Sequence, residues 1–505
     1  MPGLIRFSLI AVLSIAGAMS ACHLLLPERF AVNAPMLSAL LGWQVDPPGP
    51  EAFERRIRVA AGFRVEPWAR VPGARFLRPT SAGDLLVSAP REGRVVLVEA
   101  DGNGDGQPDG QRDLLTGLDR PHGLDLHEGW LYVAEGSAVF RVRFEAQHRA
   151  VSGQREVVVP ALPDGGNHWT KTARVGPDGA LYVSVGSSCN VCEEEDERRA
   201  AILRFPRAGG RGEIFARGLR NAVGFDWQPG TGDLYATDNG RDLLGDDFPP
   251  CELNRIVEGG DYGWPFANGD RVIDPDLGAG SEARVAASTP PAHAFAAHNA
   301  PLGIAFLSAS TAGEYRHAAL VALHGSWNRT AKDGYKVVSL HWQADGTIVE
   351  RDFLWGFLLD EDVVGRPVDV AQGPDDAIYV TDDYTGTIYR VTAGEGPGGS
   401  AKPGPGGAPA AASDPLAGLD DRERAAGAAR GAALWQRFEC AGCHDPAAAD
   451  PGVVPVPLVD LGKRWGLDSL AAFLAAPTPP MPAFPLSSSE RRDLAIHMLD
   501  VPPGG

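Results

Sequence analysis

Two cysteines and a histidine near the C-terminus have the spacing that attaches a haem to a polypeptide. The residues are Cys440-Ala441-Gly442-Cys443-His444, which supply two thiols for covalent haem attachment and an imidazole for the iron. A buried disulfide or half of a zinc site are the alternatives, but the C-terminal segment contains no second cysteine pair of the zinc type. The sequence therefore predicts a haem c and, with it, electron transfer.

A second axial ligand is expected downstream, and electron-transferring cytochromes usually take a methionine sulfur, which raises the potential. Only Met481 and Met498 follow the motif. Met481 lies in the proline-rich segment 479–484, whose extended backbone can hold a sulfur over a haem face. Met498 lies in a stretch with helical spacing and is expected in the core. We predict Met481 as the iron ligand, ahead of Met498 and of His497.

The N-terminal residues indicate export. Arg6 precedes a short apolar run, residues 9–18, which suits a signal peptide and is too short for a membrane span. Met19-Ser20-Ala21-Cys22 resembles the lipobox of bacterial lipoproteins, in which the cysteine is lipidated, although Met19 replaces the usual leucine. Ordinary cleavage and a retained anchor are the alternatives. We expect a periplasmic or cell-surface protein whose contact with a membrane is at most an N-terminal lipid.

Three further cysteines are expected to form a disulfide, because an exported protein meets an oxidising environment. The spacing Cys189-Asn190-Val191-Cys192 favours a local bridge, although Cys251 could pair with either. A redox-active role is the alternative, but no thioredoxin-like pattern surrounds these residues.

Composition excludes several classes of protein. A chain of 505 residues exceeds what one hydrophobic core normally holds, so at least two domains are expected. The 62 glycines and 42 prolines indicate a turn-rich fold. The net charge of -19 argues against nucleic acid or anionic membranes as partners.

A degenerate repeat of a polar turn, an apolar strand, a loop and a second apolar strand runs from about residue 50 to 392. Its spacing is mostly near the length of a four-stranded propeller blade, and six blades close into a ring with short, protected edges. One interval is too long and must carry an insertion, which includes residues 265–291; loops of that length are usually functional. The repeats are centred on residues 84–87, 131–133, 181–183, 234–236, 320–323 and 378–380.

After the repeats, the chain becomes rich in glycine, proline, alanine and serine, which is typical of a linker. Helical patterns follow at residues 420–439, 467–475 and 489–499, the last with Ser489 as its expected N-cap. The predicted fold class is an all-β six-bladed β-propeller plus a small all-α cytochrome c domain. The predicted boundaries are a signal peptide at 1–21, the propeller at 50–392, the linker at 393–415 and the cytochrome c domain at 416–500.

An acidic turn in the first repeat is a candidate for a structural calcium. Oxygen-bearing side chains alternate around glycines at Asp101, Asn103, Asp105 and Asp109. The turn lacks the glutamate that closes an EF-hand, since position twelve is Arg112. A structural metal and a simple acidic turn are the two interpretations.

Eight short motifs are spread over five of the six repeats. These are residues 166–168 (GNH), 186–192 (GSSCNVC), 218–221 (GLRN), 237–240 (TDNG), 252–254 (ELN), 259–265 (GGDYGWP), 324–329 (HGSWNR) and 365–370 (GRPVDV). In these motifs the segment resembles the pyrroloquinoline quinone (PQQ) dependent sugar dehydrogenases: soluble glucose dehydrogenase, aldose sugar dehydrogenases and especially the sorbosone dehydrogenase-like group. Together the motifs are far more specific than any one of them.

The resemblance implies a set of residues for sugar oxidation. His168 is expected to be the base that takes the hydroxyl proton, a task for which a neutral imidazole is suited; a core or capping histidine is the alternative. The glucose dehydrogenase relatives have an aspartate where this chain has Ser187, so another acid substitutes or the base is tuned differently. Arg220 and Asn221 are expected to contact the quinone oxygens, where a positive charge stabilises the developing oxyanion.

PQQ carries three carboxylates and needs cations, for which Arg329 and Arg366 are the candidates by motif, although each could be a solvated loop arginine. The resemblance also implies a calcium ion at the quinone, held partly by the backbone carbonyls of Gly240 and Arg241.

The expected function is that of an exported dehydrogenase that oxidises an aldose, or a related sugar or aldehyde, with PQQ. Electrons would pass to its own haem c and then to an acceptor of the respiratory chain, and the tether would raise the effective concentration of the haem near the quinone. A propeller lactonase and a non-catalytic propeller with an electron-relay cytochrome are the alternatives.

Overall fold

A computed structural model describes residues 31–33, 45–308, 311, 313–394, 416, 419–444, 458, 461, 466–474, 481 and 484–500. The chain divides into two compact units, residues 1–406 and 407–505. This division falls inside the predicted linker. The predicted signal peptide and Cys22 lie outside the described residues. Within those residues, no helix combines the length and the apolar character that a membrane span requires.

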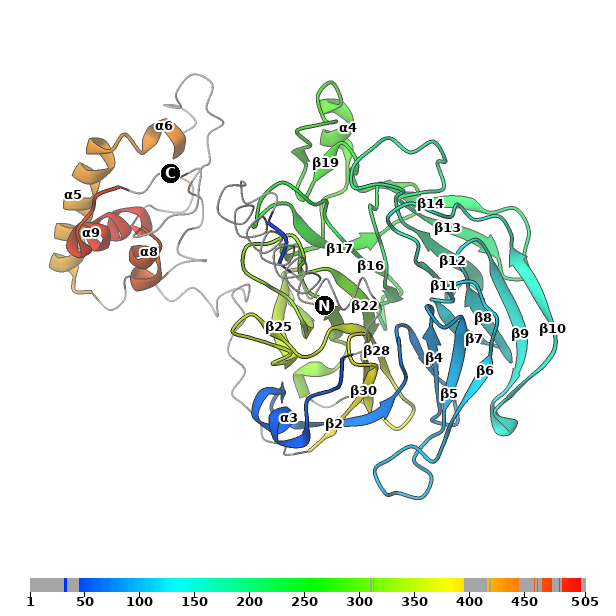
Figure 1. The fold of residues 1–505 in the computed structure, drawn as a ribbon. Coiled ribbons are helices and arrows are strands. Elements are labelled where there is room, and N and C mark those ends of the chain that lie inside the picture. The colour runs from blue at the N-terminus through cyan, green and yellow to red at the C-terminus, as the bar shows by residue number, and fades with distance from the viewer. Residues whose placement is uncertain are drawn as a thin grey trace, which may run out of the picture. The chain divides into compact units, whose positions relative to one another are not determined.

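The first unit contains six sheets of four or five strands, which are the blades of a propeller (Figure 1). The predicted six-bladed β-propeller is therefore confirmed. From the innermost strand outward, the blades are β3 (Leu77–Pro79), β4 (Leu85–Ala89), β5 (Arg94–Val98) and β6 (Gln111–Leu115); β7 (Leu124–His127), β8 (Trp130–Ala134), β9 (Val139–Glu145) and β10 (Ala150–Val159); β11 (Lys171–Val175), β12 (Ala180–Val185), β13 (Ala201–Pro206), β14 (Glu213–Arg217) and β18 (Gly260–Asp261); β15 (Phe225–Trp227), β16 (Leu234–Asp238), β17 (Pro250–Ile256) and β21 (His293–Ala297); β22 (Pro301–Phe306), β23 (Ala319–Leu323), β24 (Lys336–Trp342), β25 (Ile348–Trp355) and β1 (Arg58–Val59); and β28 (Pro367–Gln372), β29 (Ile378–Asp382), β30 (Thr387–Ala393) and β2 (Phe63–Arg70). Neighbouring strands within each blade are antiparallel, except that β18 pairs parallel with β14.

The second strand of each blade lies at the predicted centre of a repeat. These strands, β4, β8, β12, β16, β23 and β29, are buried at nearly every position. Because each lies between its sheet neighbours and is covered on both faces by adjacent blades, its residues form an apolar run. Six apolar clusters, one between each pair of neighbouring blades, form most of the core of the ring.

The ring is closed by a strand from the beginning of the chain. Strand β2 pairs with β30, so that Phe63 lies opposite Ala393 and Arg70 lies opposite Thr387. In the neighbouring blade, β1 likewise extends β25. Closing the ring in this way pairs the last blade's outer edge, which would otherwise remain an open template for another chain.

The interval predicted to carry an insertion does so between β17 and β21. It contains β18, a short hairpin of β19 (Ala267–Asn268) and β20 (Val272–Ile273), and the helix α4 (Glu282–Ala287). Asp274 of this insertion accepts two hydrogen bonds from Arg241 Nη1, at 2.9 and 2.7 Å. The insertion is thereby fixed to the loop that follows β16. A second small hairpin, of β26 (Leu358–Leu359) and β27 (Asp362–Val363), and the helix α3 (Pro50–Arg56) complete this unit, with the short 3₁₀ turns η2 (Ala146–His148) and η3 (Gly313–Tyr315).

The second unit contains the helices α5 (Asp421–Arg437), α6 (Ala441–His444), α8 (Leu467–Phe473) and α9 (Ser488–Leu499). Capping boxes begin α5 at Asp420 and α9 at Ser487. The prediction of Ser489 as the N-cap is therefore wrong, because the side chain of Ser487 accepts the Glu490 N–H instead.

Helices α5 and α9 pack closely because glycine allows their backbones to approach. A Cβ added at Gly431 would lie 2.2 Å from the carbonyl oxygen of Asp493. Arg430 donates two hydrogen bonds to the Asp493 carboxylate, both at 2.7 Å, across the same contact.

Candidate functional site

The predicted site residues of the propeller lie mainly at one rim. In every blade the innermost and second strands are antiparallel, so the start of the first and the end of the second share an edge; Lys171, for example, pairs with Val185. His168, Arg220 and Arg366 each lie one to five residues before an innermost strand. The structure therefore brings residues far apart in the sequence to the same face of the ring.

His168 is held in one tautomer by the residue that replaces the expected aspartate. Its Nδ1 lies 2.8 Å from Ser187 Oγ and 3.1 Å from the Ser187 carbonyl oxygen. The Ser187 hydroxyl donates its only proton to the carbonyl of Cys189, at 2.8 Å. Both oxygens can then only accept from Nδ1, so Nδ1 carries the proton and Nε2 carries the lone pair. Nε2 has no hydrogen-bond partner in the part of the chain that the structure describes.

The surroundings of His168 keep its imidazole neutral. Burial, followed by the positive charge of Arg220, lowers its pKa to about 3, while the Asp242 carboxylate acts in the opposite direction. The side chain therefore offers an unprotonated nitrogen at neutral pH. The sequence left open whether another acid replaces the missing aspartate. Nδ1 contacts only a hydroxyl and a carbonyl, and the Asp242 carboxylate acts on the imidazole through its charge without a direct hydrogen bond.

Gly186, at the end of β12, allows His168 and Asn221 to meet. A Cβ at this position would lie 2.5 Å from the Cβ of His168 and 2.8 Å from the Oδ1 of Asn221. Such distances are shorter than real Cβ contacts, so only glycine fits without displacing these side chains. Asn221 makes no side-chain hydrogen bond within the described residues, so its amide is available at this part of the rim.

Arg220 is buried, with 4% of its surface exposed, and all of its donors are taken by the protein. Nε and Nη2 donate to the carbonyl and side-chain oxygens of Asn190, both at 2.9 Å. Nη2 also donates to Asp242, at 3.0 Å, and Nη1 donates to the carbonyls of Asn239 and Gly240, at 3.1 and 2.9 Å. A guanidinium has five N–H groups. Arg220 thus provides a fixed positive charge at this rim, and in this arrangement it has no free N–H group to donate to a ligand.

Two buried aspartates position the arginines of the rim in the same way. Asp238 ends β16 and accepts the backbone N–H of Arg220, at 2.9 Å, and Asp382 ends β29 and accepts that of Arg366, also at 2.9 Å. Burial raises the pKa of Asp238 to about 7 and that of Asp382 to about 6. The motif Thr-Asp precedes the rim in both strands, at 237–238 and 381–382, so this device repeats between blades.

A cluster around Asp383 carries a net positive charge. Arg366 donates to this carboxylate from Nε and Nη2, at 3.1 and 2.9 Å, and Arg75 lies 2.5 Å from it. His324 Nε2 lies 3.1 Å away. Although burial acts to raise the pKa of Asp383, the arginines and His324 hold it well below its usual value. Burial and the charge of Arg366 lower the pKa of His324 to about 4, so the cluster counts two cations and one anion at neutral pH.

Arg329 is not part of this cluster. Its guanidinium donates to the carbonyls of Asp246, Ala297 and Ala331 and pairs with the Asp247 carboxylate at 3.1 Å. These contacts tie the loop after β23 to the loop after β16. The geometry therefore gives Arg329 a structural role, and its contact with a cofactor remains a prediction that these bonds do not favour.

The two positions expected to supply calcium ligands lie beside Arg220. The Gly240 carbonyl already accepts a hydrogen bond from Arg220 Nη1, and a carbonyl oxygen has a second lone pair for another contact. The Arg241 side chain is directed to Asp274 and Asp276 of the insertion, which fixes the backbone from which its carbonyl would act.

In the acidic turn at 101–109, the side-chain oxygens accept hydrogen bonds from backbone N–H groups of the same turn. Asp101 accepts the N–H groups of residues 104, 105 and 106, Asn103 accepts that of residue 105, and Asp109 accepts that of residue 102. Among the described residues, its carboxylates do not form a group of three that converge within 4.8 Å, as a metal site requires. These contacts favour the simple turn over the structural calcium.

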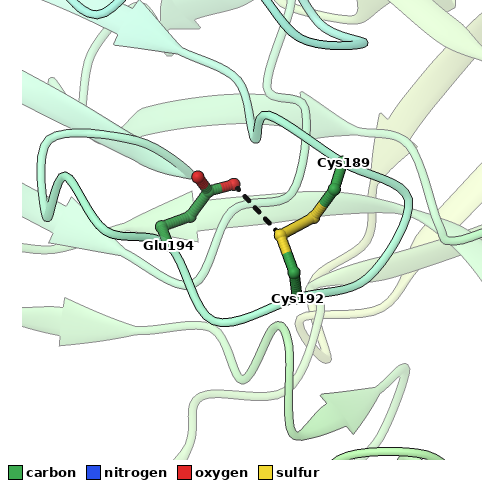
Figure 2. A group of neighbouring side chains, drawn as sticks. All are labelled: Cys189, Cys192 and Glu194. Atoms are coloured by element: carbon green, nitrogen blue, oxygen red, sulfur yellow. Dashed lines mark hydrogen bonds between the residues drawn. A yellow bond between two sulfur atoms is a disulfide. The ribbon is translucent and has the colours of Figure 1, made fainter.

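Cys189 and Cys192 form a disulfide (Figure 2), so the predicted local bridge is confirmed. Cys251 is a buried free thiol. Figure 2 also shows the Glu194 carboxylate directed at Cys192 Sγ, 3.9 Å away.

In the second unit, Cys440 and Cys443 are free thiols, the first buried and the second exposed; Cys440 directly precedes α6 and Cys443 lies within it. His444 ends α6, and its ring lies 6.0 Å from that of Trp435. His497 lies 5.9 Å from the same indole. Met481 packs at the edge of the apolar core of this unit.

Several residues of the rim escaped the sequence analysis. Asn190 and Asp242, which hold Arg220, and Arg75, His324 and Asp383, which surround Arg366, were not proposed for the site. His324 lies in the motif at 324–329, and Asp383 follows the repeated Thr-Asp at 381–382, so sequence patterns point to both residues. Arg75 left none beyond its place before β3.

The fold and its polar rim define a six-bladed propeller with a site at one end of its axis. Residues 130–390 match the family model described as glucose / sorbosone dehydrogenase. The chain belongs to this family.

Among proteins of similar sequence, one from Borreliella burgdorferi, described only as an uncharacterized protein, is 32% identical over 290 residues, which are 54% of this chain and 76% of that protein. A pyrroloquinoline quinone-dependent pyranose dehydrogenase of Coprinopsis cinerea is 23% identical over 422 residues, which are 69% of this chain and 56% of that protein.

Solved structures share the propeller. A calcium structure of a Trichoderma reesei carbohydrate-active enzyme of family AA12 has a TM-score of 0.59 and 22% identity, with 67% of this chain and 97% of that chain covered. The holo form of the PQQ domain of pyranose dehydrogenase from Coprinopsis cinerea has a TM-score of 0.58 and 21% identity, with 68% and 98% covered. At these identities the likeness shows the fold.

Proposed function

We propose that this chain is an exported PQQ-dependent sugar dehydrogenase that oxidises an aldose, or a related sugar or aldehyde, and passes the electrons to its own haem c. The family membership supports the oxidoreductase class. The observation that carries the proposal is the arrangement of His168, whose Nδ1 is fixed by Ser187 and whose neutral Nε2 has no partner among the described residues, with the Asn221 side chain on the other side of Gly186.

The residues of the rim fit PQQ. Three carboxylates require cations, and the cluster of Arg75, Arg366 and Asp383 has one positive charge in excess, with Arg366 Nη1 free of hydrogen bonds to the described residues. Buried polar atoms without partners in the described part of the chain include Arg75 Nε, His122 Nε2, Asn239 Oδ1 and Asn299 Oδ1. Each belongs to a residue at the same rim, and unpaired buried polar groups are rare unless a ligand satisfies them.

When bound, PQQ would supply an electrophilic carbonyl that accepts the hydride of the sugar. His168 would accept the hydroxyl proton at Nε2 as the hydride leaves. Its Nδ1–H remains on Ser187, so the imidazolium that forms keeps its orientation. The fixed charge of Arg220 favours negative charge developing near it, and the free Asn221 amide can donate to an oxygen at the same place.

A calcium ion beside the quinone would be held partly by the carbonyls of Gly240 and Arg241. Backbone carbonyls suit this hard cation. The Arg241–Asp274 pair is buried on both sides, with 4% and 1% of the side chains exposed, and would keep the loop rigid around the ion.

The second unit offers the donors that a haem c requires. Both thiols of Cys440 and Cys443 are free, and His444 follows on the same short helix. Two thiols and an imidazole at this spacing suit covalent attachment and ligation of a haem. Met481 remains our choice for the other axial ligand, because it lies at the edge of the core where an iron face would be shielded.

We also propose that the protein is exported to the periplasm or the cell surface, through the segment 1–21 and with or without a lipid on Cys22. An acceptor of the respiratory chain would take the electrons from the haem.

The test is haem absorbance of the purified full chain after reconstitution with PQQ and calcium. Addition of an aldose such as D-glucose should reduce the haem only in the reconstituted protein. His168→Ala should slow this reduction by at least about 100-fold, since loss of a general base costs about 10²–10⁴, and should leave reduction by dithionite intact. His148→Ala, an exposed histidine on another blade, is the matched control and should react at the normal rate.

Haem reduction by sugar that persists in His168→Ala would show that the base is another residue. If a panel of aldoses, sorbosone and simple aldehydes never reduces the haem of the reconstituted protein, the dehydrogenase proposal fails. Turnover of lactones without PQQ would then identify a hydrolase, and reduction only by external donors would identify an electron relay.

A further inference from the structure

The loop Ser187–Cys192 connects the predicted base to the rest of the rim. It begins where β12 ends, and the disulfide between Cys189 and Cys192 closes it (Figure 2). The spacing of the two cysteines and the expected export of the protein predict the bridge but give it no function. Its neighbours in the fold give it a more specific role.

One side of the loop reaches His168. The carbonyl that accepts the Ser187 hydroxyl proton belongs to Cys189, a half of the disulfide. If that carbonyl turned away, the Ser187 hydroxyl could donate to Nδ1 instead of accepting from it. Only the Ser187 carbonyl, 3.1 Å from Nδ1, would then oppose a change of His168 to the tautomer with its proton on Nε2, which cannot act as the base.

The other side of the loop holds Arg220 and the segment after β16. Asn190 accepts two hydrogen bonds from Arg220, one at its carbonyl and one at its side-chain Oδ1. Its amide also pairs with the backbone of Asp242 in both directions: Oδ1 accepts the Asp242 N–H at 2.8 Å, and Nδ2 donates to the Asp242 carbonyl at 3.1 Å. A single side chain between the two half-cystines thus joins the loop, the arginine and the Gly240–Asp242 backbone.

We propose that the disulfide-closed loop Ser187–Cys192 is a thiol-sensitive positioning element of the site, with Asn190 as its central residue. This inference rests on the proposed function for its effect on catalysis. With the bridge intact, the loop holds the tautomer of His168 and the place of Arg220. With the bridge reduced, both are released and sugar oxidation slows.

The bridge is suited to local control more than to global stability. Its two cysteines are only three residues apart, and a cross-link that closes so short a loop removes little entropy from the unfolded chain. Its effect falls instead on the conformations open to residues 189–192 in the folded protein. The propeller core, which lies in the blades, should remain folded without it.

Reduction would need an external dithiol. The dithiol would give two electrons and two protons to the Cys189–Cys192 bond, which becomes two thiols, and would itself become a disulfide. The Glu194 carboxylate beside Cys192 Sγ disfavours a thiolate there, so the reduced pair is expected to remain as thiols.

The first test uses the apo-protein, without activity. Hydrogen–deuterium exchange is compared between the wild type and Cys189→Ser/Cys192→Ser, which mimics the reduced loop. Exchange should accelerate at the Asp242 amide and in residues 187–192, and should not change in β8 and β9 of another blade. Asn190→Ala should accelerate exchange at Asp242 even with the bridge intact, whereas Gln228→Ala, an amide in a turn of the same blade as Asp242, should not.

The second test measures steady-state oxidation of D-glucose by the reconstituted protein with an artificial electron acceptor. The wild type is reduced, its thiols are blocked with iodoacetamide and the reagents are removed; a sample blocked without reduction is the control. We expect kcat to fall by about 10- to 100-fold in the reduced sample, in the double serine variant and in Asn190→Ala, with smaller changes in KM and in the unfolding temperature. The double variant should no longer respond to reductant.

The outcomes separate this inference from the proposed function. Unchanged exchange at Asp242 in the double serine variant and in Asn190→Ala would overturn the inference, whatever the activity. Full activity of the wild type after mass spectrometry shows both thiols free would overturn it as well. A wild type that never oxidises a sugar would instead refute the proposed function, and the exchange data would still decide whether the loop positions the site.

Discussion

Replacing Ser187 by aspartate tests how the structure tunes His168. The serine hydroxyl lies 2.8 Å from Nδ1 and can accept its proton without adding charge. A carboxylate at the same place would favour the imidazolium, and an opposite charge within about 4–6 Å moves a pKa by about 1–3 units. The pKa of His168 should therefore rise from about 3 to between about 4 and 6.

The sign of this change determines the pH dependence. A base acts only when it is unprotonated, so His168 itself should not limit kcat/KM of the wild type between about pH 7 and about pH 4, and any change there should come from Asp238 and Asp382, which titrate in both proteins. Ser187→Asp should lose activity as the pH falls through about 4–6. The measurement is kcat/KM for D-glucose against pH in the reconstituted protein. Ser152→Asp is the control and should follow the wild type. Ser152 is an exposed serine in a different blade from Ser187, and its hydroxyl donates to Glu145.

A profile for Ser187→Asp that overlays the wild type would refute this reasoning, provided that PQQ binding, followed by quenching of tryptophan fluorescence, is retained. It would mean that Ser187 does not face the group that titrates. The pKa of His168 read by NMR in the apo-protein provides a second measure that does not depend on turnover.

Two glycine substitutions should separate close contacts that matter from those that can relax. Gly186→Ala places a methyl group 2.5 Å from the Cβ of His168 and should lower kcat by about 10-fold or more while the unfolding temperature changes little, measured by steady-state oxidation and by melting of the full chain. Gly431→Ala brings a Cβ to 2.2 Å from a backbone oxygen of Asp493 and should destabilise the second unit by about 1–3 kcal/mol, seen as earlier loss of helical circular dichroism. Gly427→Ala meets side-chain atoms of Ile496, the nearest being Cδ1 at 2.6 Å, and no backbone atom within the three nearest, so an equal loss in both variants would argue against the backbone clash.

The architecture of the ring was predictable because its signal is local. Each second strand carries an apolar run after a turn, and six such runs at blade spacing leave few alternatives. Strand β2 was not predicted, because its half-exposed residues give no clean pattern and its partner lies more than 300 residues away. The same limit explains the N-cap of α9, where three serines in a row offer equivalent sequence signals and only the geometry selects Ser487.

The site was predictable to the level of motifs but not of contacts. The motifs singled out His168, Arg220 and Arg366, and the structure places all three at the same rim of the ring. They could not show that the Arg220 guanidinium donates all its hydrogen bonds to protein atoms, since this depends on Asn190 and Asp242 from two other segments. For Arg329 the motif indicated a cofactor contact, whereas its guanidinium joins two loops of the protein.

The pairing of β2 with β30 also bears on how the protein is made. The first strand of the ring must wait until residues 387–393 have been synthesised before it finds its partner, so the propeller cannot finish folding during most of translation. A chain cut short within the last blade would keep eight residues of β2 as an unpaired edge, open to other molecules of the same kind. Such a truncated product would therefore expose an unpaired strand at its beginning as well as at its broken end.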